Sequence, residues 1–282
     1  MKNWKKALAL GLSAALSFTL LAACSGGTSA TPAPSASASA PAESTAPTES
    51  AAFTTVVPGE LHMATNAQFP PYEMASDNGG YQGIDVEIAT KIAEKLDLKL
   101  VVDDMDFNSV ITAVQTGKSD MAMAGLTVNE ERKQNVNFTD SYATGVQVVI
   151  VKDGSPITSV DDLLADGATY VVGTQDATTG YIYASDDMGE DRVVAYTNGA
   201  TAVQALLSGS VDCVIIDNEP AKAFVAANPG LQILDTDYVA EDYAIGISKE
   251  NDALLDAVNG ALKDLIADGT VKSIVDTYIT AQ

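Results

Sequence analysis

Short apolar runs alternate with helix-like patterns from Gly59 onward. Residues 61–65 alternate in polarity as a half-buried strand does. The segment 85–96 carries an apolar residue at every fourth position, which predicts a helix opened by Asp85 with one buried face. This order of elements is typical of βα units and of parallel sheets. The chain is therefore predicted to be an α/β protein.

One helix–turn–strand unit occurs twice, about 90 residues apart. In the first copy a predicted helix ends at Gly117, and Gly117-Lys-Ser-Asp120 leads into an apolar strand, 121–124. The second copy is Gly209-Ser-Val-Asp212 with the strand 211–216. Open α/β sheets bind ligands beyond the carboxyl ends of their strands. Two similar lobes facing one cleft are the simplest interpretation, and a chance recurrence of a common unit is the alternative.

Composition excludes two classes of function. The 282 residues include 15 Lys+Arg and 38 Asp+Glu, a net charge of −23, so the basic surface that nucleic-acid binding requires is missing. One histidine, His62, and two cysteines, Cys24 and Cys213, cannot supply the ligands of a zinc site. We expect no metal, no cofactor and no nucleic-acid partner. Cys213 lies inside an apolar strand and is predicted to be a buried, inert thiol.

The first 57 residues are predicted to be a secretion signal and a tether. Residues 1–23 combine three lysines with a short apolar stretch, as a secretory signal peptide does. The sequence Leu21-Ala-Ala-Cys24 resembles the bacterial lipobox, in which the cysteine carries the lipid; an incidental cysteine after a plain signal is the alternative. In the predicted tether, 24–57, the 33 residues after Cys24 include 26 Ala, Ser, Thr or Pro, which cannot form a core. No later stretch approaches the roughly 20 apolar residues of a spanning helix.

A candidate carboxylate site follows the strand 121–124. Thr127-Val-Asn-Glu130 has the form of a capping box, which predicts a helix beginning at Thr127 with Arg132 in its early turns. A helix start, a hydroxyl and a guanidinium together suit a carboxylate, because arginine binds it in bidentate fashion. The alternative is an ordinary capped helix with a solvated arginine.

The second half offers a comparable set. Gln175-Asp-Ala-Thr178-Thr179-Gly180 joins the predicted strand 170–173 to a helix beginning near Tyr181, although such hydroxyls often only cap the helix. Asp217 ends a very apolar strand, where an unpaired acid is costly to bury. A ligand ammonium would pair with it; a cap for the helix that Pro220 opens, or an ion pair with a lysine, are the alternatives. Phe69 and Phe107 are either walls of the site or plain core.

Several spaced motifs together resemble one known family. Gly83-Ile-Asp-Val-Glu-Ile88 resembles the signature of the family 3 extracellular solute-binding proteins, the polar-amino-acid receptors of ABC importers. The same order continues through Met105-Asp-Phe107, Ala124-Gly-Leu-Thr127, Glu131-Arg132, Phe138-Thr-Asp-Ser-Tyr142, the Thr178-Thr179-Gly180 turn, Val211-Asp212, Asp217 and Ala267-Asp-Gly269. The resemblance covers residues 59–279.

The resemblance implies a role for each candidate residue. Arg132, Thr127 and the Thr178/Thr179 turn would bind the α-carboxylate of an amino acid, and Asp217 its α-ammonium. Phe69 and Phe107 would flank its side chain, Asn66 and Gln175 would reach its distal end, and Ala124 and Gly125 would complete the ligand-binding set. Many relatives carry an acid where this chain has Asn66, and Gln175 is also uncharged, so the expected ligand is polar and neutral. The turn Asp176-Ala177 departs from the small residue and glycine that relatives often have there.

The resemblance also implies the architecture and the function. The expected fold is the two-lobed, type II periplasmic-binding-protein-like fold, with two Rossmann-like lobes joined by two crossover strands. Lobe 1 would comprise 58–142 and 243–282, lobe 2 would comprise 143–242, and the hinges would lie at 138–146 and 242–247. A lipid-anchored monomer on the outer face of the bacterial cytoplasmic membrane would deliver a free L-amino acid to an ABC permease and its ATPase. An enzyme similar to cyclohexadienyl dehydratase, or a surface adhesin, is the alternative.

Overall fold

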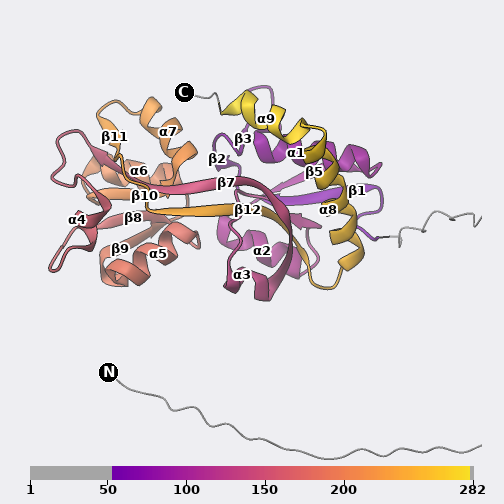
Figure 1. The fold of residues 1–282 in the computed structure, drawn as a ribbon, viewed down its shortest axis with the longest axis horizontal. Helices are drawn as coiled ribbons and strands as arrows, with labels where there is room; N and C mark the ends of the chain where they lie inside the picture. Colours follow the sequence, from indigo (N-terminus) through magenta and orange to yellow (C-terminus); the bar gives the residue numbers. More distant parts are fainter. Residues whose placement is uncertain (1–52, 280–282) are drawn as a thin grey trace, which may run out of the picture. The chain divides into compact units, whose positions relative to one another are not determined.

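The computed structural model describes residues 53–279, which form two lobes at the two ends of a pair of long strands (Figure 1). The predicted signal peptide, Cys24 and most of the predicted tether lie outside the described residues. The long strands are β7 (Val136–Lys152) and β12 (Val239–Ser248). Lobe 1 holds β1 (Glu60–Thr65), β2 (Gln68–Phe69), β3 (Glu73–Ala75), β4 (Tyr81–Gln82), α1 (Ile84–Lys95), β5 (Lys99–Asp104), α2 (Phe107–Gln115), β6 (Met121–Ala122), α3 (Glu130–Asn135), α8 (Asp252–Ala267) and α9 (Thr270–Tyr278).

Lobe 2 is built from the middle of the chain. It holds α4 (Val160–Leu164), β8 (Val172–Gln175), α5 (Thr179–Met188), the 3-10 helix η1 (Glu190–Arg192), β9 (Val193–Tyr196), α6 (Gly199–Ser208), β10 (Cys213–Asp217), α7 (Asn218–Ala227) and β11 (Leu231–Ile233). In the span from 53 to 279, no helix is both long and apolar enough to cross a membrane.

One sheet of nine strands runs through both lobes. Its order is β5-β1-β6-β12-β7-β10-β8-β9, with β11 also paired to β7. Within this sheet, β5 pairs in parallel with β1 and β1 with β6 in lobe 1, as β10 does with β8 and β8 with β9 in lobe 2. A separate antiparallel sheet, β2-β3-β4, belongs to lobe 1. The pairs β6–β12, β12–β7 and β7–β10 are antiparallel. The predicted α/β class is therefore confirmed, and the parallel part of each lobe is completed by the two long strands.

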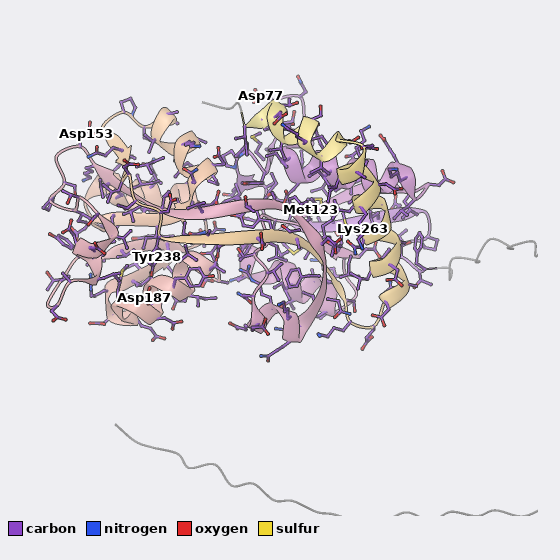
Figure 2. The ribbon with its side chains drawn as sticks, viewed as in Figure 1. Asp77, Met123, Asp153, Asp187, Tyr238 and Lys263 are labelled. Carbon is purple, nitrogen blue, oxygen red and sulfur yellow. The ribbon has the colours of Figure 1, made fainter. Side chains whose placement is uncertain are left out.

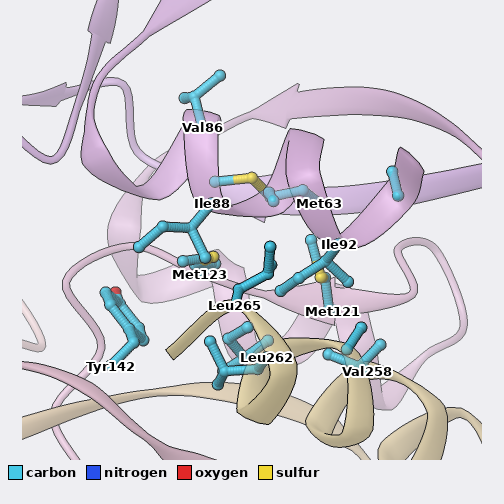
Figure 3. Packing of buried hydrophobic residues seen from close by; sticks show 14 of the residues in the cluster. Met63, Val86, Ile88, Ile92, Met121, Met123, Tyr142, Val258, Leu262 and Leu265 are labelled. Atoms are coloured by element: carbon cyan, nitrogen blue, oxygen red, sulfur yellow. The ribbon is translucent and has the colours of Figure 1, made fainter. Parts of the chain in front are cut away.

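Helices cover both faces of the sheet in lobe 1. On one face Ile88 and Ile92 of α1 pack in one cluster with Leu262 and Leu265 of α8 and Met63 of β1 (Figure 3). On the other face lies a second cluster that includes side chains of α2. Parallel strands occur almost only where both faces are covered in this way, so the amphipathic helices and the buried strands depend on one another.

Lobe 2 repeats this arrangement with different helices. Val203 and Leu206 of α6 pack on one face, and Ala184 of α5 and Leu163 of α4 pack on the other. Cys213 is fully buried in the second of these clusters, as predicted, and burial raises the pKa of its thiol to about 12. The thiol therefore stays protonated and unreactive at neutral pH.

The repeated Gly-x-x-Asp motif has the same structural role in both lobes. The Asp120 carboxylate accepts the backbone N–H of His62 at 2.7 Å, and the Asp120 N–H donates to the His62 carbonyl at 2.9 Å. The Asp212 carboxylate accepts the Val171 N–H at 2.7 Å, and the Asp212 N–H donates to the Val171 carbonyl at 2.8 Å. Each aspartate thus holds the start of the strand that follows it against the neighbouring parallel strand. The two motifs are one structural unit used twice.

Two features mark the strands that connect the lobes. The β7–β12 ladder contains register shifts between Tyr243 and Gly246, where a bulge bends the strand. Near this place α8 is fastened to β7: the Lys263 ammonium lies 3.4 Å from the Asp140 carboxylate, and the Asp140 N–H donates to the Asn259 side chain at 2.9 Å. Lys263 is labelled on lobe 1 in Figure 2.

Several predicted boundaries were wrong by a few residues. The helix expected from Asp85 begins one residue earlier, the helix expected near Tyr181 begins at Thr179, and the strands expected at 170–173 and 211–216 run to Gln175 and Asp217. The strand expected at 121–124 pairs only over Met121–Ala122. Apolar patterns mark the centre of an element, whereas local hydrogen bonds at the ends decide where it starts.

The two repeated aspartates predict unequal losses of stability. Asp120 is 5% exposed and also accepts the Val56 N–H at 2.7 Å, whereas Asp212 is exposed. Hydrogen bonds to a charged group contribute about 1.5–3 kcal/mol, less where water competes. Asp120→Ala should therefore lower the free energy of unfolding in urea by about 2–3 kcal/mol and Asp212→Ala by about 1 kcal/mol. Equal losses would contradict this account.

Candidate functional site

A cavity lies between the lobes, where the strands of both end. Its walls include every binding residue that the sequence singled out: Asn66, Phe69, Phe107, Ala124, Gly125, Thr127, Arg132, Gln175, Thr178, Thr179 and Asp217. The structure therefore brings residues 151 positions apart into one site. Their roles toward a ligand stay predictions.

Arg132 is buried without a direct ion-pair partner in the described chain, and Glu241 is the acid whose charge acts on it from a distance. Only 6% of the residue is exposed, and its guanidinium donates to the Thr127 carbonyl at 2.8 Å and, across the cleft, to the Ala177 carbonyl at 3.2 Å. The ring of Phe107 lies 5.4 Å below it. No carboxylate among residues 53–279 forms an ion pair with it, and desolvation lowers its pKa. Such a cation suits a carboxylate brought by a ligand.

The capping box predicted at Thr127 was wrong. Asn129 is the N-cap of α3, and its side chain accepts the Arg132 N–H at 2.8 Å. Thr127 forms a β-bridge with Tyr243, and the Val128 N–H donates to the Asp242 carbonyl, so this stretch is extended and the helix begins later. The Thr127 hydroxyl is consequently not used as a cap. It lies 3.4 Å from the Thr179 hydroxyl of lobe 2.

Asp217 is held at the junction of lobe 2 and both crossover strands. Its carboxylate accepts the Val146 N–H of β7 at 3.0 Å, the Tyr243 hydroxyl of β12 at 2.8 Å and the Glu219 N–H at 3.1 Å. The last bond caps α7, so the capping alternative is correct while the residue also lines the cavity. Burial raises its pKa to about 6, and the three donors oppose that rise. A Cβ on Gly145 would collide with this carboxylate and with the Tyr243 hydroxyl.

The turn before α5 keeps a glycine-like shape without a glycine. Ala177 has φ 59°, the left-handed region that disfavours residues with a Cβ, at a cost of roughly 1–2 kcal/mol. This conformation aims the Ala177 carbonyl at Arg132. Thr178 caps α5 by accepting the Tyr181 N–H at 3.3 Å and donates to the Gln175 carbonyl at 2.7 Å, so its hydroxyl is committed locally.

Two amide side chains meet across the cleft at another wall of the cavity. The Gln175 amide donates to the Asn66 carbonyl oxygen at 3.0 Å, and the Asn66 amide donates to the Met105 carbonyl at 2.9 Å. Both residues are almost fully buried. At the edge of the cleft the Asn108 amide donates to Asp176 at 3.0 Å. These bonds join the lobes directly.

Sequence reasoning missed five further residues of the cavity wall: Glu73, Gln147, Ile215, Ile216 and Tyr243. Ile215 and Ile216 precede Asp217 in the strand already singled out, so their proximity was available from the sequence. Gln147 and Tyr243 lie on the crossover strands, whose approach to the site depends on the tertiary fold. Glu73 belongs to a short strand with no recognisable motif.

Glu73 is the most unusual of these residues. It is fully buried and accepts no hydrogen bond from an N–H group of residues 53–279, and its hydrogen-bonding neighbour is the Asp85 carboxyl. Desolvation raises its pKa well above the usual value, and the neighbouring Asp85 carboxyl adds to the rise. Asp85 is itself fully buried with a pKa raised to about 6, although it accepts the Gly125 N–H at 2.8 Å and the Tyr142 hydroxyl at 2.9 Å.

Comparison with known proteins decides the family. The profile of the bacterial extracellular solute-binding proteins, family 3, matches residues 61–281. The chain belongs to this family. A probable histidine-binding protein of Neisseria gonorrhoeae is 28% identical over 231 residues, which cover 80% of this chain and 85% of that protein.

Solved structures give the same result as the family profile. A structure of an ancestral arginine-binding protein bound to glutamine is 36% identical, with a TM-score of 0.74, over 80% of this chain and all of that chain. Another, of an ancestral arginine-binding protein bound to arginine, is 37% identical, with a TM-score of 0.72, over 78% of this chain and 98% of that one. The type II periplasmic-binding-protein fold expected from the family 3 resemblance is confirmed.

The buried acids of this solute-binding protein predict an inverted pH dependence of stability. The pKa values of Glu73, Asp85 and Asp217 are raised in the folded state, so the fold binds protons more readily than the unfolded chain. The resulting stability is complete below about pH 4 and is lost as pH rises through 6. The urea midpoint should be higher at pH 5.5 than at pH 8, and Glu73→Gln should raise it at pH 8.

An exposed glutamate supplies the control. Glu94 lies on the surface of α1, where its carboxylate pairs with the Lys91 ammonium at 2.8 Å. Glu94→Gln should leave the difference between the two midpoints unchanged. A wild-type protein that is more stable at pH 8 than at pH 5.5 would show that other groups dominate.

Proposed function

We propose that this protein captures a free amino acid between its lobes. The observation that carries the proposal is a pair of unmatched opposite charges in one cavity: Arg132 from lobe 1 and Asp217 from the end of β10 in lobe 2. Neither side chain forms an ion pair with another residue of the part of the chain that the structure describes. An α-carboxylate complements the first and an α-ammonium the second, and both belong to every free amino acid.

We further propose a neutral polar side chain for the main ligand. The amides of Asn66 and Gln175 form an uncharged wall of the cavity, where many family members carry an acid at the position of Asn66. Ala124, Gly125, Phe69 and Phe107 would enclose the aliphatic part of the ligand. One solved relative, an ancestral arginine-binding protein, holds glutamine, which is a ligand of this class.

Binding would stabilise the closed arrangement of the lobes. A ligand that touches both lobes shifts the equilibrium by the difference in its affinity for the open and closed forms. We propose lobe boundaries at 58–142 with 243–282, and 143–242, with hinges at 138–146 and 242–247. The register shifts in β12 fall within the second hinge. An ABC permease and its ATPase would then recognise the closed form and accept the amino acid.

Location follows from the start of the chain. Lipidation of Cys24 would hold a monomer at the outer face of the bacterial cytoplasmic membrane, with 24–57 as its tether.

We infer binding without catalysis. The aromatic and polar wall of the cavity accounts for Asp217, the acid that an enzyme of the dehydratase type would use, without a chemical step.

A thermal-shift screen tests this function. The purified protein, stripped of bound ligand by unfolding and refolding, is screened against the twenty amino acids, cystine and ornithine. A ligand at 100 times its Kd adds about 2.7 kcal/mol of stability, which should raise the melting temperature by several degrees. We expect the largest shifts from neutral polar amino acids. A folded protein that responds to none of the panel would contradict the proposal.

Two substitutions test the charge pairing. Arg132→Ala and Asp217→Ala should each weaken the binding of the best ligand at least tenfold in calorimetric titration, because each leaves one charge of the ligand buried without its partner. Arg192→Ala is a matched control. The Arg192 guanidinium also donates to two backbone carbonyls, of Tyr170 and Leu163, but does not line the cavity. Unchanged affinity in both cavity variants would remove this assignment.

A further inference from the structure

We infer that Glu73 is a protonated carboxylic acid at neutral pH, and that the hydrogen bond it donates to Asp85 positions one wall of the cavity. Glu73 lies in the short strand β3 and Asp85 in the first turn of α1. Both are positioning residues: they act through the backbone and side chains that they hold, and not by contact with an amino acid. The effect on binding rests on the proposed function, whereas the proton does not.

Hydrogen-bond chemistry requires a proton between the two acids. Both residues are fully buried, and their side chains are hydrogen-bonded to one another. An ionised carboxylate only accepts hydrogen bonds, so two carboxyl groups can bond to each other only when one of them is protonated. Two carboxylates at the same place would repel each other without water to screen them. The buried pair therefore carries a proton.

The other partners of Asp85 show which acid holds this proton. Oxygen Oδ2 of Asp85 accepts the Gly125 N–H at 2.8 Å and the Tyr142 hydroxyl at 2.9 Å, and both donors favour the charged form. Oxygen Oδ1 of Asp85 is buried and accepts no N–H group from the described part of the chain. It is thus free to accept the Glu73 hydroxyl. Glu73, which has no N–H donor of its own among residues 53–279, is the protonated member of the pair.

No cation stands near Glu73 to favour its ionised form. The titratable groups that face it are Asp85 of α1, Asp104 of β5, Tyr72 of the turn between β2 and β3, and Tyr142 of β7. These are acids and phenols, so within residues 53–279 a second negative charge would have no counter-ion. Burial and this surrounding act in the same direction, and the neutral acid is the stable form.

The bond from Glu73 to Asp85 joins two parts of the cavity wall. Glu73 is the register partner of Phe69 in the β2–β3 pair. Gly125, whose N–H is held by Asp85, has φ 53°, and a Cβ there would lie 2.9 Å from the Phe69 ring. The ring therefore rests against the Gly125 backbone. Tyr142, the other donor to Asp85, lies on β7 in the first proposed hinge, so one proton connects the Phe69 wall with the strand that crosses between the lobes.

Infrared spectroscopy detects the proton directly, without any amino acid. At pH 7.5 Asp85 and Asp217, with pKa values of about 6, are largely ionised. A C=O stretch of a protonated carboxyl should nevertheless be present in the wild-type protein and absent in Glu73→Gln. Glu241→Gln is the matched control, because Glu241 is also buried but accepts the Gln147 amide at 2.9 Å; it should retain the band. Absence of the band in wild type, or its persistence in Glu73→Gln, would overturn the inference.

Two substitutions of one residue test the positioning. Glu73→Gln retains an N–H donor for Asp85, whereas Glu73→Leu has a similar size and no donor. In protein stripped of bound ligand, hydrogen exchange of the Gly125 amide should match wild type in the glutamine variant and be at least tenfold faster in the leucine variant. Glutamine, the ligand of one solved relative, should bind Glu73→Gln within threefold of wild type and Glu73→Leu at least fivefold more weakly.

The outcomes separate this inference from the proposed function. Gly125 exchange that is equal in wild type and in Glu73→Leu would overturn the positioning role. If Glu73→Leu does not fold, faster Gly125 exchange in Glu73→Gln than in wild type would overturn it instead, because the retained donor would then have failed to replace the acid. A wild-type protein that does not bind glutamine bears on the choice of amino acid alone, and the infrared and exchange results still decide the inference.

Discussion

The buried guanidinium of Arg132 is the constraint around which the site is organised. A cation with 6% exposure is costly to bury unless its hydrogen-bonding groups are satisfied, and here two carbonyls, from Thr127 and Ala177, perform that role. Carbonyls satisfy donors without cancelling the charge. Ala177 offers its carbonyl from a left-handed conformation, and Thr127 offers its carbonyl from an extended stretch that pairs with Tyr243. The site thereby retains a positive charge that a ligand can neutralise.

The buried acids of the site also lack a partner of opposite charge in the described chain. Asp217 is supplied with three donors and no cation, and Glu73 has the Asp85 carboxyl as its neighbour and no cation. Asp217 also connects the cavity to both crossover strands, because the Val146 N–H and the Tyr243 hydroxyl converge on one oxygen. Gly145 permits this approach, since any side chain there would occupy the space of these atoms. Charge in the cavity and the backbone between the lobes are thus linked through a single carboxylate.

The sequence allowed the fold and most of the cavity wall to be predicted, for identifiable reasons. The Gly-x-x-Asp motifs at Asp120 and Asp212 carry a local hydrogen-bond pattern, so their recurrence indicated a repeated unit that the structure contains. Thr127 was misread because a capping box is a local signal, and pairing with Tyr243, more than 100 residues away, overrides it. Glu73 could not be found from its neighbours, because a glutamate in a short strand usually faces water. Only the packed fold shows that it does not.

The lobes are joined by paired strands and not by flexible loops, and this has a mechanical consequence. β7 and β12 are hydrogen-bonded to one another along the crossing and belong to the same sheet as both lobes. Sliding one lobe past the other would break that ladder, whereas bending across the two strands preserves most of it, especially near the bulge. The connection therefore bends easily in one direction, across the two strands, and resists displacement in the others. Its stiffness, set by backbone pairing, would limit how far and how fast the cleft can open, independently of the side chains that line it.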